Sequence, residues 1–372
     1  MPSPSRQKIT IQDVAEAVGA AKSTVSAALT GNGRVSPERR AEILNVARQM
    51  GFEPNPHAQR LSNGNSNNTV ALFSLDLDLG VGTHKLKIIQ RLLATQGYDV
   101  PVYSYGSFGG GEVVPVAKLM GTLCRQRPRA IICFTSGFSD DVWGELERYQ
   151  SEGGIVVCYD FKVPLECDTV VFDREDNTYQ ATRHLLDLGH RKIGFYRAAP
   201  SDLPPTELRL QGFCRALAEQ GLKPHKAWLF HEGLNEEGGE LIAKKFLELK
   251  HRPSAMCIVN DTAAAMFIIQ LRKAGIDVPS EVSVVSHDDT PIARCSAVPL
   301  TTATHPVEAI AHQVVAFLLS RLQGKYSGEQ RCKIIRGELI KRQSCAAYVA
   351  AEGLNNRIPL QNGHKSESAI RV

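Results

Sequence analysis

The sequence predicts an α/β protein made of a small N-terminal helical unit and two larger lobes, each built on a doubly wound parallel sheet. Three observations support this prediction. Short apolar runs alternate with amphipathic helical stretches after Thr69, which is typical of buried parallel strands covered by helices on both faces. The first fifty or so residues contain only helical patterns. Between the two parts, the stretch SNGNSNN has the composition of a linker.

The N-terminal unit carries start and stop signals for three short helices. Thr10 and Asp13 have the spacing of a capping box, and Gly19 ends this first helix. A second helix is expected over residues 22–29, and Ser36 with the following proline starts a third that ends at Gly51. The side chains expected to face inward are Val14, Val18, Val25, Leu29, Ile43, Leu44 and Ala47.

Two short helices joined by a Gly-Ala-Ala turn and followed by a third have the shape of a helix-turn-helix, whose second helix enters the DNA major groove. The exposed face of that helix should carry Lys22, Ser23, Ser26 and Ala27, small or polar groups that allow a close approach. Residues 1–62 hold eight basic and five acidic side chains, so +3 of the chain's net charge of +4 lies there. A small helical interaction module with a solvated basic face is the alternative.

The later part of the chain contains seven expected strands, VALFSL, AIICF, IVVCY, TVVF, KIGFY, AMCIV and VSVVS. Segments such as NTYQATRHLLDLGH and ELRLQGFCRALAEQGL are the helices expected between them. Seven such strands over this length imply two α/β lobes. A ligand cleft is expected at the carboxyl ends of the strands.

Bulk composition sets further limits. A chain of 372 residues with 43% apolar side chains is long enough for two or three domains. The nine cysteines are scattered singly, which argues against a disulfide framework or a structural zinc site and fits a reducing compartment. The N-terminus MPSPSRQK lacks the apolar segment of a signal peptide, and no run is long enough to span a membrane. We therefore expect a soluble, cytoplasmic protein.

Two short motifs suggest other functions more weakly. GVGTHK follows a strand and opens a helix, like the start of a dinucleotide-binding loop, but the third glycine and a phosphate-loop lysine are missing. The run His287-Asp288-Asp289 contains acid–base groups, although neighbours in sequence usually point in different directions. We predict no catalytic residues, no cofactor and no metal site.

Several long motifs occur in one order along the chain: ITIQDVAEAVGAAKSTVSAALTGNGRVSPERR, GFEPNPHAQRL, VVFDREDNTYQATRHLLDLGHRKIGFY, ELRLQGFCRAL, AMCIVNDTAAA, GIDVPSEVSVVSHDDTP and PLTTATHP. Together they resemble the lactose-repressor family (LacI/GalR type) from Ile9 to Ser344. The resemblance implies a helix-turn-helix DNA-binding domain over residues 8–53 and a hinge helix and linker over 54–68. It also implies a two-lobed, periplasmic-binding-protein-like effector and dimerisation domain over 69–345, in which the chain crosses between lobes near residues 165, 303 and 328. The tail, residues 346–372, is polar and expected to be disordered.

For DNA binding, the resemblance places Lys22, Ser23 and Ala27 at base-reading positions and Leu61 in the minor groove as a hinge wedge. The positions that touch phosphate in the family are Thr24, Ser26, Arg34, Ser36 and Asn55. This sequence departs from the family at two places. Ala21 replaces the serine that caps the recognition helix, and Ala27 replaces an arginine, which removes one guanine contact.

For the effector, the positions implied by the resemblance are Asp76, Asp160, Arg209, Asn260, Asp288 and His305. An arginine, carboxylates and an amide around a cleft can bind ligand hydroxyls, which suits a sugar or sugar derivative. Leu234 stands where the family often has an aromatic platform, and the loop DLDLGVGTHK departs from the family's Asn-Pro and aromatic pattern.

These residues favour a homodimeric, ligand-responsive transcription regulator, most simply a repressor, that binds a pseudo-palindromic operator and is not an enzyme. Two other classes remain open. A solute-binding protein shares the two-lobed fold but would need export and would not need a DNA-reading unit. A sugar-processing enzyme would need a nucleophile or an acid–base pair in the cleft, for which only the His287-Asp288-Asp289 run is available.

Overall fold

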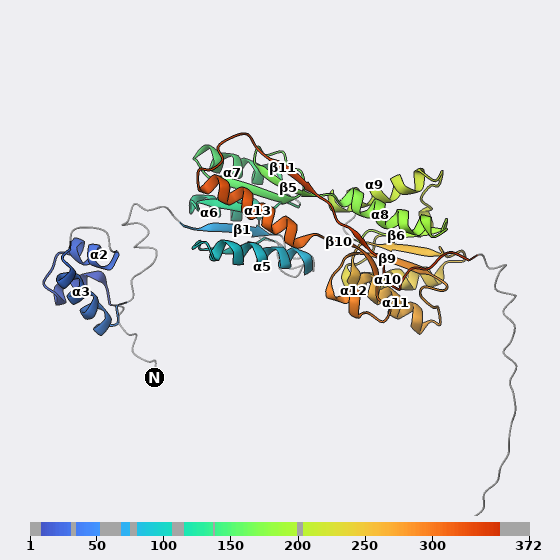
Figure 1. The fold of residues 1–372 in the computed structure, drawn as a ribbon, viewed down its shortest axis with the longest axis horizontal. Coiled ribbons are helices and arrows are strands. Elements are labelled where there is room, and N and C mark those ends of the chain that lie inside the picture. The colour runs from blue at the N-terminus through green and yellow to red at the C-terminus, as the bar shows by residue number, and fades with distance from the viewer. Residues whose placement is uncertain are drawn as a thin grey trace, which may run out of the picture.

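The computed structural model describes residues 9–30, 35–52, 68–74, 80–105, 115–136, 138–198 and 204–349. These residues form a three-helix unit and two α/β lobes, each with one six-stranded sheet (Figure 1). The predicted fold class is confirmed. The predicted hinge and linker fall almost entirely outside the described residues, which resume at residue 68.

The three-helix unit consists of α1 (Ile11–Ala17), α2 (Lys22–Thr30) and α3 (Pro37–Gln49). Thr10 and Asp13 form the expected capping box at the start of α1, and the Ser36 hydroxyl accepts a hydrogen bond from the Arg39 amide at the start of α3. Val14, Val25 and Ile43 are fully buried at the centre of the unit. Local start signals and one apolar face per helix therefore fix this unit, as the sequence indicates.

Two of the expected inward positions are wrong or only partly right. Leu44 is 37% exposed, because Ile43 and Ala47, four residues apart, occupy the inward face of α3 and Leu44 lies one step around the helix. On α2, Ala28 is fully buried and Leu29 is only half-buried. Small residues thus allow the short helices to pack closely.

The first lobe contains a parallel sheet with the strand order β11-β5-β4-β3-β1-β2. Its strands are β1 (Val70–Ser74), β2 (Val102–Ser104), β3 (Ala130–Phe134), β4 (Ile155–Asp160), β5 (Asp168–Phe172) and β11 (Cys332–Ile335). Alternate strand residues face two separate cores. One core lies under α5 (Gly80–Ala94) and α13 (Val307–Leu322), and the other under α6 (Val116–Arg125) and α7 (Asp140–Ser151).

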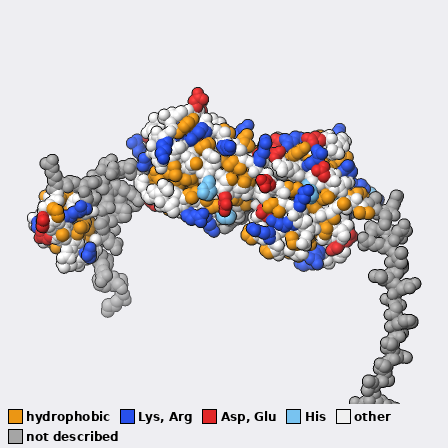
Figure 2. Space-filling view, viewed as in Figure 1, with side chains coloured by type: hydrophobic (Ala, Val, Ile, Leu, Met, Phe, Trp, Pro, Cys, Tyr) orange, Lys and Arg blue, Asp and Glu red, His pale blue; other side chains and the backbone are white. Residues whose placement is uncertain are grey.

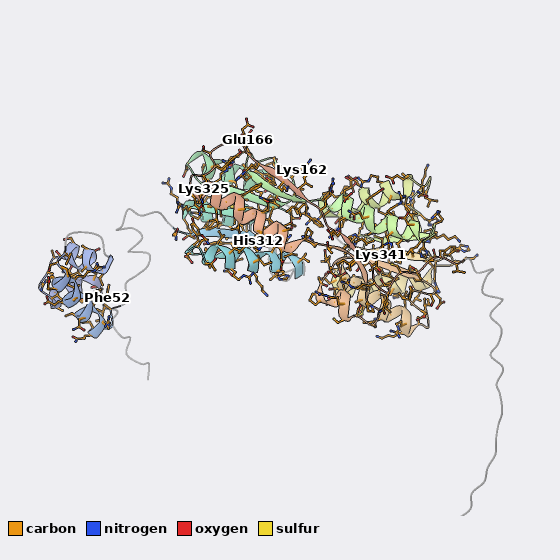
Figure 3. All side chains as sticks on the ribbon, viewed as in Figure 1. Phe52, Lys162, Glu166, His312, Lys325 and Lys341 are labelled. Atoms are coloured by element: carbon orange, nitrogen blue, oxygen red, sulfur yellow. The ribbon has the colours of Figure 1, made fainter. Side chains whose placement is uncertain are left out.

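The second lobe contains a sheet with the order β12-β10-β9-β8-β6-β7, in which only β12 is antiparallel to its neighbour. Its strands are β6 (Ile193–Tyr196), β7 (Leu229–Phe230), β8 (Ala255–Ile258), β9 (Ser283–Asp288), β10 (Thr301–Thr304) and β12 (Leu339–Ile340). The helical elements of this lobe are α8 (Arg174–Asp187), α9 (Pro204–Ala218), η1 (Lys226–Trp228), α10 (Asn235–Glu248), α11 (Asp261–Lys273) and α12 (Pro291–Cys295). His312 on α13 and Lys341 after β12 mark the two lobes in Figure 3.

The chain passes between the lobes three times, as predicted, but each crossing lies later than expected. The crossings follow β5, β10 and β11, at residues 173, 305–306 and 336–338. The expected positions 165 and 328 precede β5 and β11, whose strands belong to the first lobe. Strands β2, β7, β10, β11 and β12 have no long apolar run, and the sequence pattern missed them for this reason.

The start of the predicted tail is also ordered. The Ala346 amide donates to Ser283 Oγ at 3.0 Å, and the Tyr348 amide donates to the Leu188 carbonyl at 2.8 Å, so both residues are attached to the second lobe. All nine cysteines are free, as expected. No helix in the described part of the chain is long and apolar enough to cross a bilayer. Figure 2 shows acidic and basic side chains spread over both lobes, with apolar side chains between them.

Candidate functional site

A cleft lies between the two lobes at the carboxyl ends of their strands, where the doubly wound pattern predicts it. The first lobe contributes the start of α5 and the residues at the ends of β3 and β4. The second lobe contributes residues after β6, β8 and β9 and the inner face of α9. The cavity volume is about 200 Å³, below the roughly 300–1,000 Å³ of sites for drug-sized ligands, so the cleft suits a small, compact ligand.

A buried ion cluster consists of Lys85, Asp160, Arg174 and His305, and the first three of these residues form one wall of the cleft. Lys85 Nζ contacts an Asp160 carboxylate oxygen and lies 3.1 Å from His305 Nε2. Arg174 donates to the Asp160 carbonyl at 2.8 Å, and its Nη2 lies 3.3 Å from the carboxylate. The Arg174 guanidinium also stacks over Phe161, 4.2 Å from the ring centroid. The ion cluster joins α5, β4 and two of the three crossings between the lobes.

Burial changes the charges within the ion cluster. Burial alone would raise the pKa of Asp160, but Lys85 and Arg174 outweigh it and hold that pKa well below its usual range. Burial lowers the pKa of Lys85 to about 8 in spite of the attraction of Asp160. Burial, followed by the charge of Lys85, places the pKa of His305 well below its ordinary value. At neutral pH two cations therefore share one carboxylate, and His305 is neutral.

The opposite wall presents Arg197, Arg209, Asn260 and Asp288 from the second lobe. The Asn260 side chain caps α11, because its Oδ1 accepts from the Ala263 amide at 2.7 Å, while its amide nitrogen makes no hydrogen bond with the residues that the structure describes. The side chains of Arg197 and Arg209 likewise have no hydrogen bond or ion pair within the described ranges. We call these four residues the open wall, since their polar groups are available to a ligand.

Asp288 on the open wall is held in an unusual backbone conformation, with φ +100°. This is the left-handed region, which costs energy for a residue with a side chain and is found most often at functional sites. Its carboxylate lies 3.6 Å from His305 Nδ1. Burial lowers the pKa of Arg209 to about 10, and the charge of Asp288 opposes that shift. The charges of Asp288 and Arg209 thus influence each other on the open wall.

Asp261, beside Asn260, has a different role. Its two carboxylate oxygens accept hydrogen bonds from the Ser286 hydroxyl at 2.6 Å, the Thr302 hydroxyl at 2.9 Å and the Thr290 amide at 2.6 Å. Burial, followed by the charge of Asp288, raises the pKa of Asp261 to about 6. Asp261 therefore ties the segment after β9 to α11.

The neighbours of Asp288 point away from it, as expected for the His287-Asp288-Asp289 run. His287 Nδ1 lies 2.9 Å from the Ile258 carbonyl, and Asp289 pairs with Arg342 at 2.6 Å. The three side chains therefore do not converge on one reacting atom. Within the described ranges, no group of three His, Cys, Asp or Glu residues is placed to hold a metal ion.

Comparison with known proteins places both parts of the chain in one group. The family model for bacterial regulatory proteins of the lacI family matches residues 10–55, and the periplasmic binding protein-like domain model matches residues 182–345. The HTH-type transcriptional regulator DegA of Bacillus subtilis (strain 168) is 30% identical over 91% of this chain and 98% of its own. The chain belongs to the LacI family. It is a DNA-binding transcription regulator.

Two solved structures of other proteins share the fold of this LacI-family chain. The Lac repressor dimer bound to operator and the anti-inducer ONPF has a TM-score of 0.76 at 24% identity, covering 92% of this chain and 100% of that one. The complex of the transcriptional regulator CelR with cellobiose has a TM-score of 0.66 at 22% identity, covering 90% of this chain and 99% of that one.

The predicted effector residues of this LacI-family regulator fall in different places. Arg209, Asn260 and Asp288 come together on the open wall, and Asp160 lines the cleft from within the ion cluster. His305 is buried behind Asp160 and is not among the residues that line the cleft. Asp76 lies outside the described residues.

Sequence reasoning missed several residues that shape the cleft. Lys85 had a visible signal, since it occupies the apolar stripe of α5 that continues through Ile89 and Leu93 at steps of four. Phe134 and Phe161 line the first-lobe wall, so aromatic rings are present although Leu234 replaces the expected one. The remaining residues missed are Arg174, Arg197 and Asp261, whose roles depend on contacts between distant segments.

The predicted DNA-contacting residues are partly described. Lys22 and Ser23 are exposed at the start of α2, whereas Thr24, Ser26 and Ala27 are half-buried along it. Ser36 is exposed and caps α3. Arg34, Asn55 and Leu61 lie outside the described residues. In the helical unit, Arg39 and Arg40 donate to the carbonyls of Val18 and Ala28 and so fix the ends of α1 and α2.

Proposed function

We propose that this regulator is a repressor whose affinity for a pseudo-palindromic operator is controlled by a small, hydroxyl-bearing effector bound in the cleft. The observation that carries the proposal is the open wall, where an arginine, a carboxylate and an amide converge without protein partners for all their polar groups. Hydroxyl groups of a sugar or sugar derivative both donate and accept, so they fit Asp288 together with Arg209 and Asn260. The CelR complex with cellobiose supports an effector of this kind.

The coupling of effector and DNA would be a population shift between two arrangements of the lobes. The cleft is lined from both lobes, and three chain crossings connect them, so a ligand that contacts both walls favours one arrangement. The arrangement of the lobes in each subunit would then set the spacing of the recognition helices in a homodimer. The operator-bound dimer of the Lac repressor supports this assembly.

The homodimer has a candidate surface on the second lobe. Leu241 on α10 and Ile269 on α11 are each 37% exposed, and the two helices are joined by a hydrogen bond from Gln270 to Glu240 at 3.2 Å. Exposed large apolar side chains on adjoining helices suit a subunit interface.

We propose that this protein works in the cytoplasm as a regulator and not as an enzyme.

On DNA, Lys22, Ser23 and Ala27 would read bases, while Thr24, Ser26, Arg34, Ser36 and Asn55 would contact phosphates. Leu61 would enter the minor groove. Because Ala27 lacks a long side chain, Ala27→Arg should add a guanine contact and change one base position in each half-site. Selection of sites from random DNA tests this, and identical consensus sequences for both proteins would remove Ala27 from the reading face.

Effector control is tested with Arg209→Ala and Asp288→Ala. Both variants should bind operator nearly as well as the unmodified protein but lose the response to effector, because the substituted side chains face the cleft and not DNA. A thermal-shift screen of sugars, sugar phosphates and purines supplies the ligand, since a compound at 100 times its Kd adds about 2.7 kcal/mol of stability. Asp289→Ala, next to the cleft but paired with Arg342, is the matched control. Unchanged calorimetric titrations in both cleft variants would contradict the site.

A further inference from the structure

The cleft contains more cationic than anionic side chains among the residues that the structure describes. Four cations line it, Lys85, Arg174, Arg197 and Arg209. Three carboxylates line it, Asp160, Asp261 and Asp288. Both histidines that adjoin these groups, His287 and His305, are kept neutral at pH 7 by burial. The described residues therefore leave one positive charge over in a confined, partly dehydrated site, where uncompensated charge is costly.

The carboxylates are unequally available to the arginines. Asp160 is shared by Lys85 and Arg174 within the ion cluster. Asp261 is occupied by the hydroxyls and the amide that it accepts from, and pairs with no cation in the described part of the chain. Only Asp288 remains near Arg209. Among the residues that the structure describes, Arg197 thus has no carboxylate of its own.

Arg197 is the residue that needs an explanation. It follows β6 directly, and its amide donates to the Phe230 carbonyl at 3.1 Å, so its backbone is fixed by the sheet. Its side chain is half-buried and lines the cleft. A guanidinium carries five donors in a planar fork that matches carboxylate and phosphate oxygens. Placing one there with no acceptor among the described residues leaves those donors for a ligand.

The facing wall adds to the positive field. Gly80, Val81 and Gly82, from the GVGTHK motif, form the first turn of α5 and line the cleft. This first turn contains no acidic side chain, so nothing on it offsets the partial positive charge of the helix N-terminus. The motif that resembles the start of a nucleotide-binding loop therefore faces the cleft opposite two arginines, although it has no third glycine.

We infer that the effector of this cleft carries an anionic group on a hydroxyl-bearing carbon frame, and that Arg197 and Arg209 bind the anion. This inference rests on the proposed function, since it names the chemical class of the effector. The hydroxyls are bound by Asp288 and Asn260, the two groups of the open wall that can accept from or donate to them. A carboxylate, as in a sugar acid, and a phosphate ester, as in a sugar phosphate, share this chemistry.

The experiment uses the full chain and probes in matched sets. Thermal unfolding is followed at constant ionic strength in chloride, in inorganic phosphate, and with glucose, glucuronate, glucose 6-phosphate, ribose and ribose 5-phosphate. Inorganic phosphate should raise the Tm above that in chloride. In at least one set, an anionic sugar should bind at least about tenfold more tightly than its neutral parent, as measured by calorimetry, because charge-assisted hydrogen bonds are the stronger ones. Comparison of glucuronate with glucose 6-phosphate distinguishes the carboxylate from the phosphate.

Two variants assign the effect to the arginines. Arg197→Gln and Arg209→Gln replace the guanidinium with a shorter, uncharged amide, and each should lower the affinity for the anionic sugar at least about tenfold. Each should also reduce the Tm increase in phosphate to the general effect that this salt has on folded proteins. Arg294→Gln changes an exposed arginine on α12 of the same lobe that does not line the cleft, and should behave like the unmodified protein. Operator binding by each variant without ligand verifies that it is folded.

Several results would overturn the inference. A neutral sugar that binds as tightly as its anionic relatives would do so, as would a phosphate effect on Tm that is equally large in Arg197→Gln and the unmodified protein, or that is missing in the unmodified protein. These outcomes differ from a failure of the proposed function. If a neutral ligand occupies the cleft and changes operator affinity equally in Arg197→Gln, only the anionic effector is wrong. If no cleft ligand changes operator affinity, the proposed function itself is wrong.

Discussion

On the wall of the cleft formed by the ion cluster, Lys85 and Arg174 already have Asp160 as a protein partner, whereas Arg197 and Arg209 on the open wall have none within the described chain. The ion cluster is almost fully buried, with Lys85 and Asp160 each 1% exposed. Charges that are paired within the protein hold segments together, and unpaired charges in a cleft are available for binding. The same residue types therefore serve structure on one wall and, in the function that we propose, recognition on the other.

The largest expected effect compares Asp160→Asn with Asp288→Asn. Asp160→Asn leaves Lys85 and Arg174 buried without a counter-charge, so we expect the free energy of unfolding to fall by about 3–5 kcal/mol. Asp288→Asn changes a carboxylate without a buried cation bound to it, and asparagine tolerates positive φ, so its effect should be within about 1 kcal/mol. Urea denaturation of both variants provides the measurement.

This comparison would break down if the two variants were equally stable. It would be reversed if Asp288→Asn lost more stability than Asp160→Asn. Calorimetric titration completes the test, because Asp288→Asn should lose effector binding while it keeps its stability. A stable Asp288→Asn protein with unchanged effector affinity would place Asp288 outside the recognition surface.

The ion cluster should also affect stability at alkaline pH. Burial lowers the pKa of Lys85 from 10.5 in the unfolded chain to about 8 in the folded protein. Between these two values the unfolded chain binds a proton that the folded protein has released, so the contribution of Lys85 to the free energy of unfolding rises with pH. Relative to Lys85→Met, the unmodified protein should gain about 2–3 kcal/mol between pH 7 and pH 10.

Urea denaturation at pH 7, 8, 9 and 10 measures this difference. Lys87→Met, on the solvent side of the same helix, should give a pH-independent offset from the unmodified protein, since Lys87 is exposed. Parallel pH profiles for the unmodified protein and Lys85→Met would mean that Lys85 keeps its ordinary pKa and that the ion cluster is less dehydrated than its geometry indicates.

The sequence predicts the local features of this protein better than its long-range contacts, for a physical reason. The three-helix unit depends on local signals, such as the Thr10–Asp13 capping box and the Ser36 cap, and these were found correctly. The position of the cleft follows from parallel strands, whose carboxyl ends lie on one side. By contrast, the contact of Lys85 with Asp160 joins residues 75 positions apart, and no local pattern encodes such a pairing.

The errors have equally local causes. Leu44 is apolar and near the inward face of α3, but a helix of this length buries only the residues aligned with Ile43 and Ala47. The late lobe crossings reflect β5 and β11, which belong to the first lobe, so the chain crosses only after each of these strands ends. The assignment of His305 to the effector, which the family resemblance implies, stays a prediction, and Phe172 covers its ring at a centroid distance of 4.2 Å.

The smallest expected effect concerns Asn260, which belongs to both roles at once. Its Oδ1 caps α11 through the Ala263 amide, and its amide nitrogen is available to the effector. Asn260→Ala removes both groups and should lower the free energy of unfolding by about 1 kcal/mol, the usual value of an N-cap. Asn260→Asp keeps an oxygen that can cap the helix, so its stability should stay within about 0.5 kcal/mol of the unmodified protein.

Effector affinity and stability should change independently in these two variants. Both lack the N–H donors of the amide, so both should bind the effector about tenfold less tightly, although only Asn260→Ala is less stable. Urea denaturation and calorimetric titration of the same preparations measure the two properties. If Asn260→Asp binds the effector as well as the unmodified protein, Asn260 acts only as a helix cap and the open wall consists of Arg197, Arg209 and Asp288. If instead Asn260→Asp is as unstable as Asn260→Ala, the cap hydrogen bond is not what stabilises α11, and the amide acts on the cleft alone.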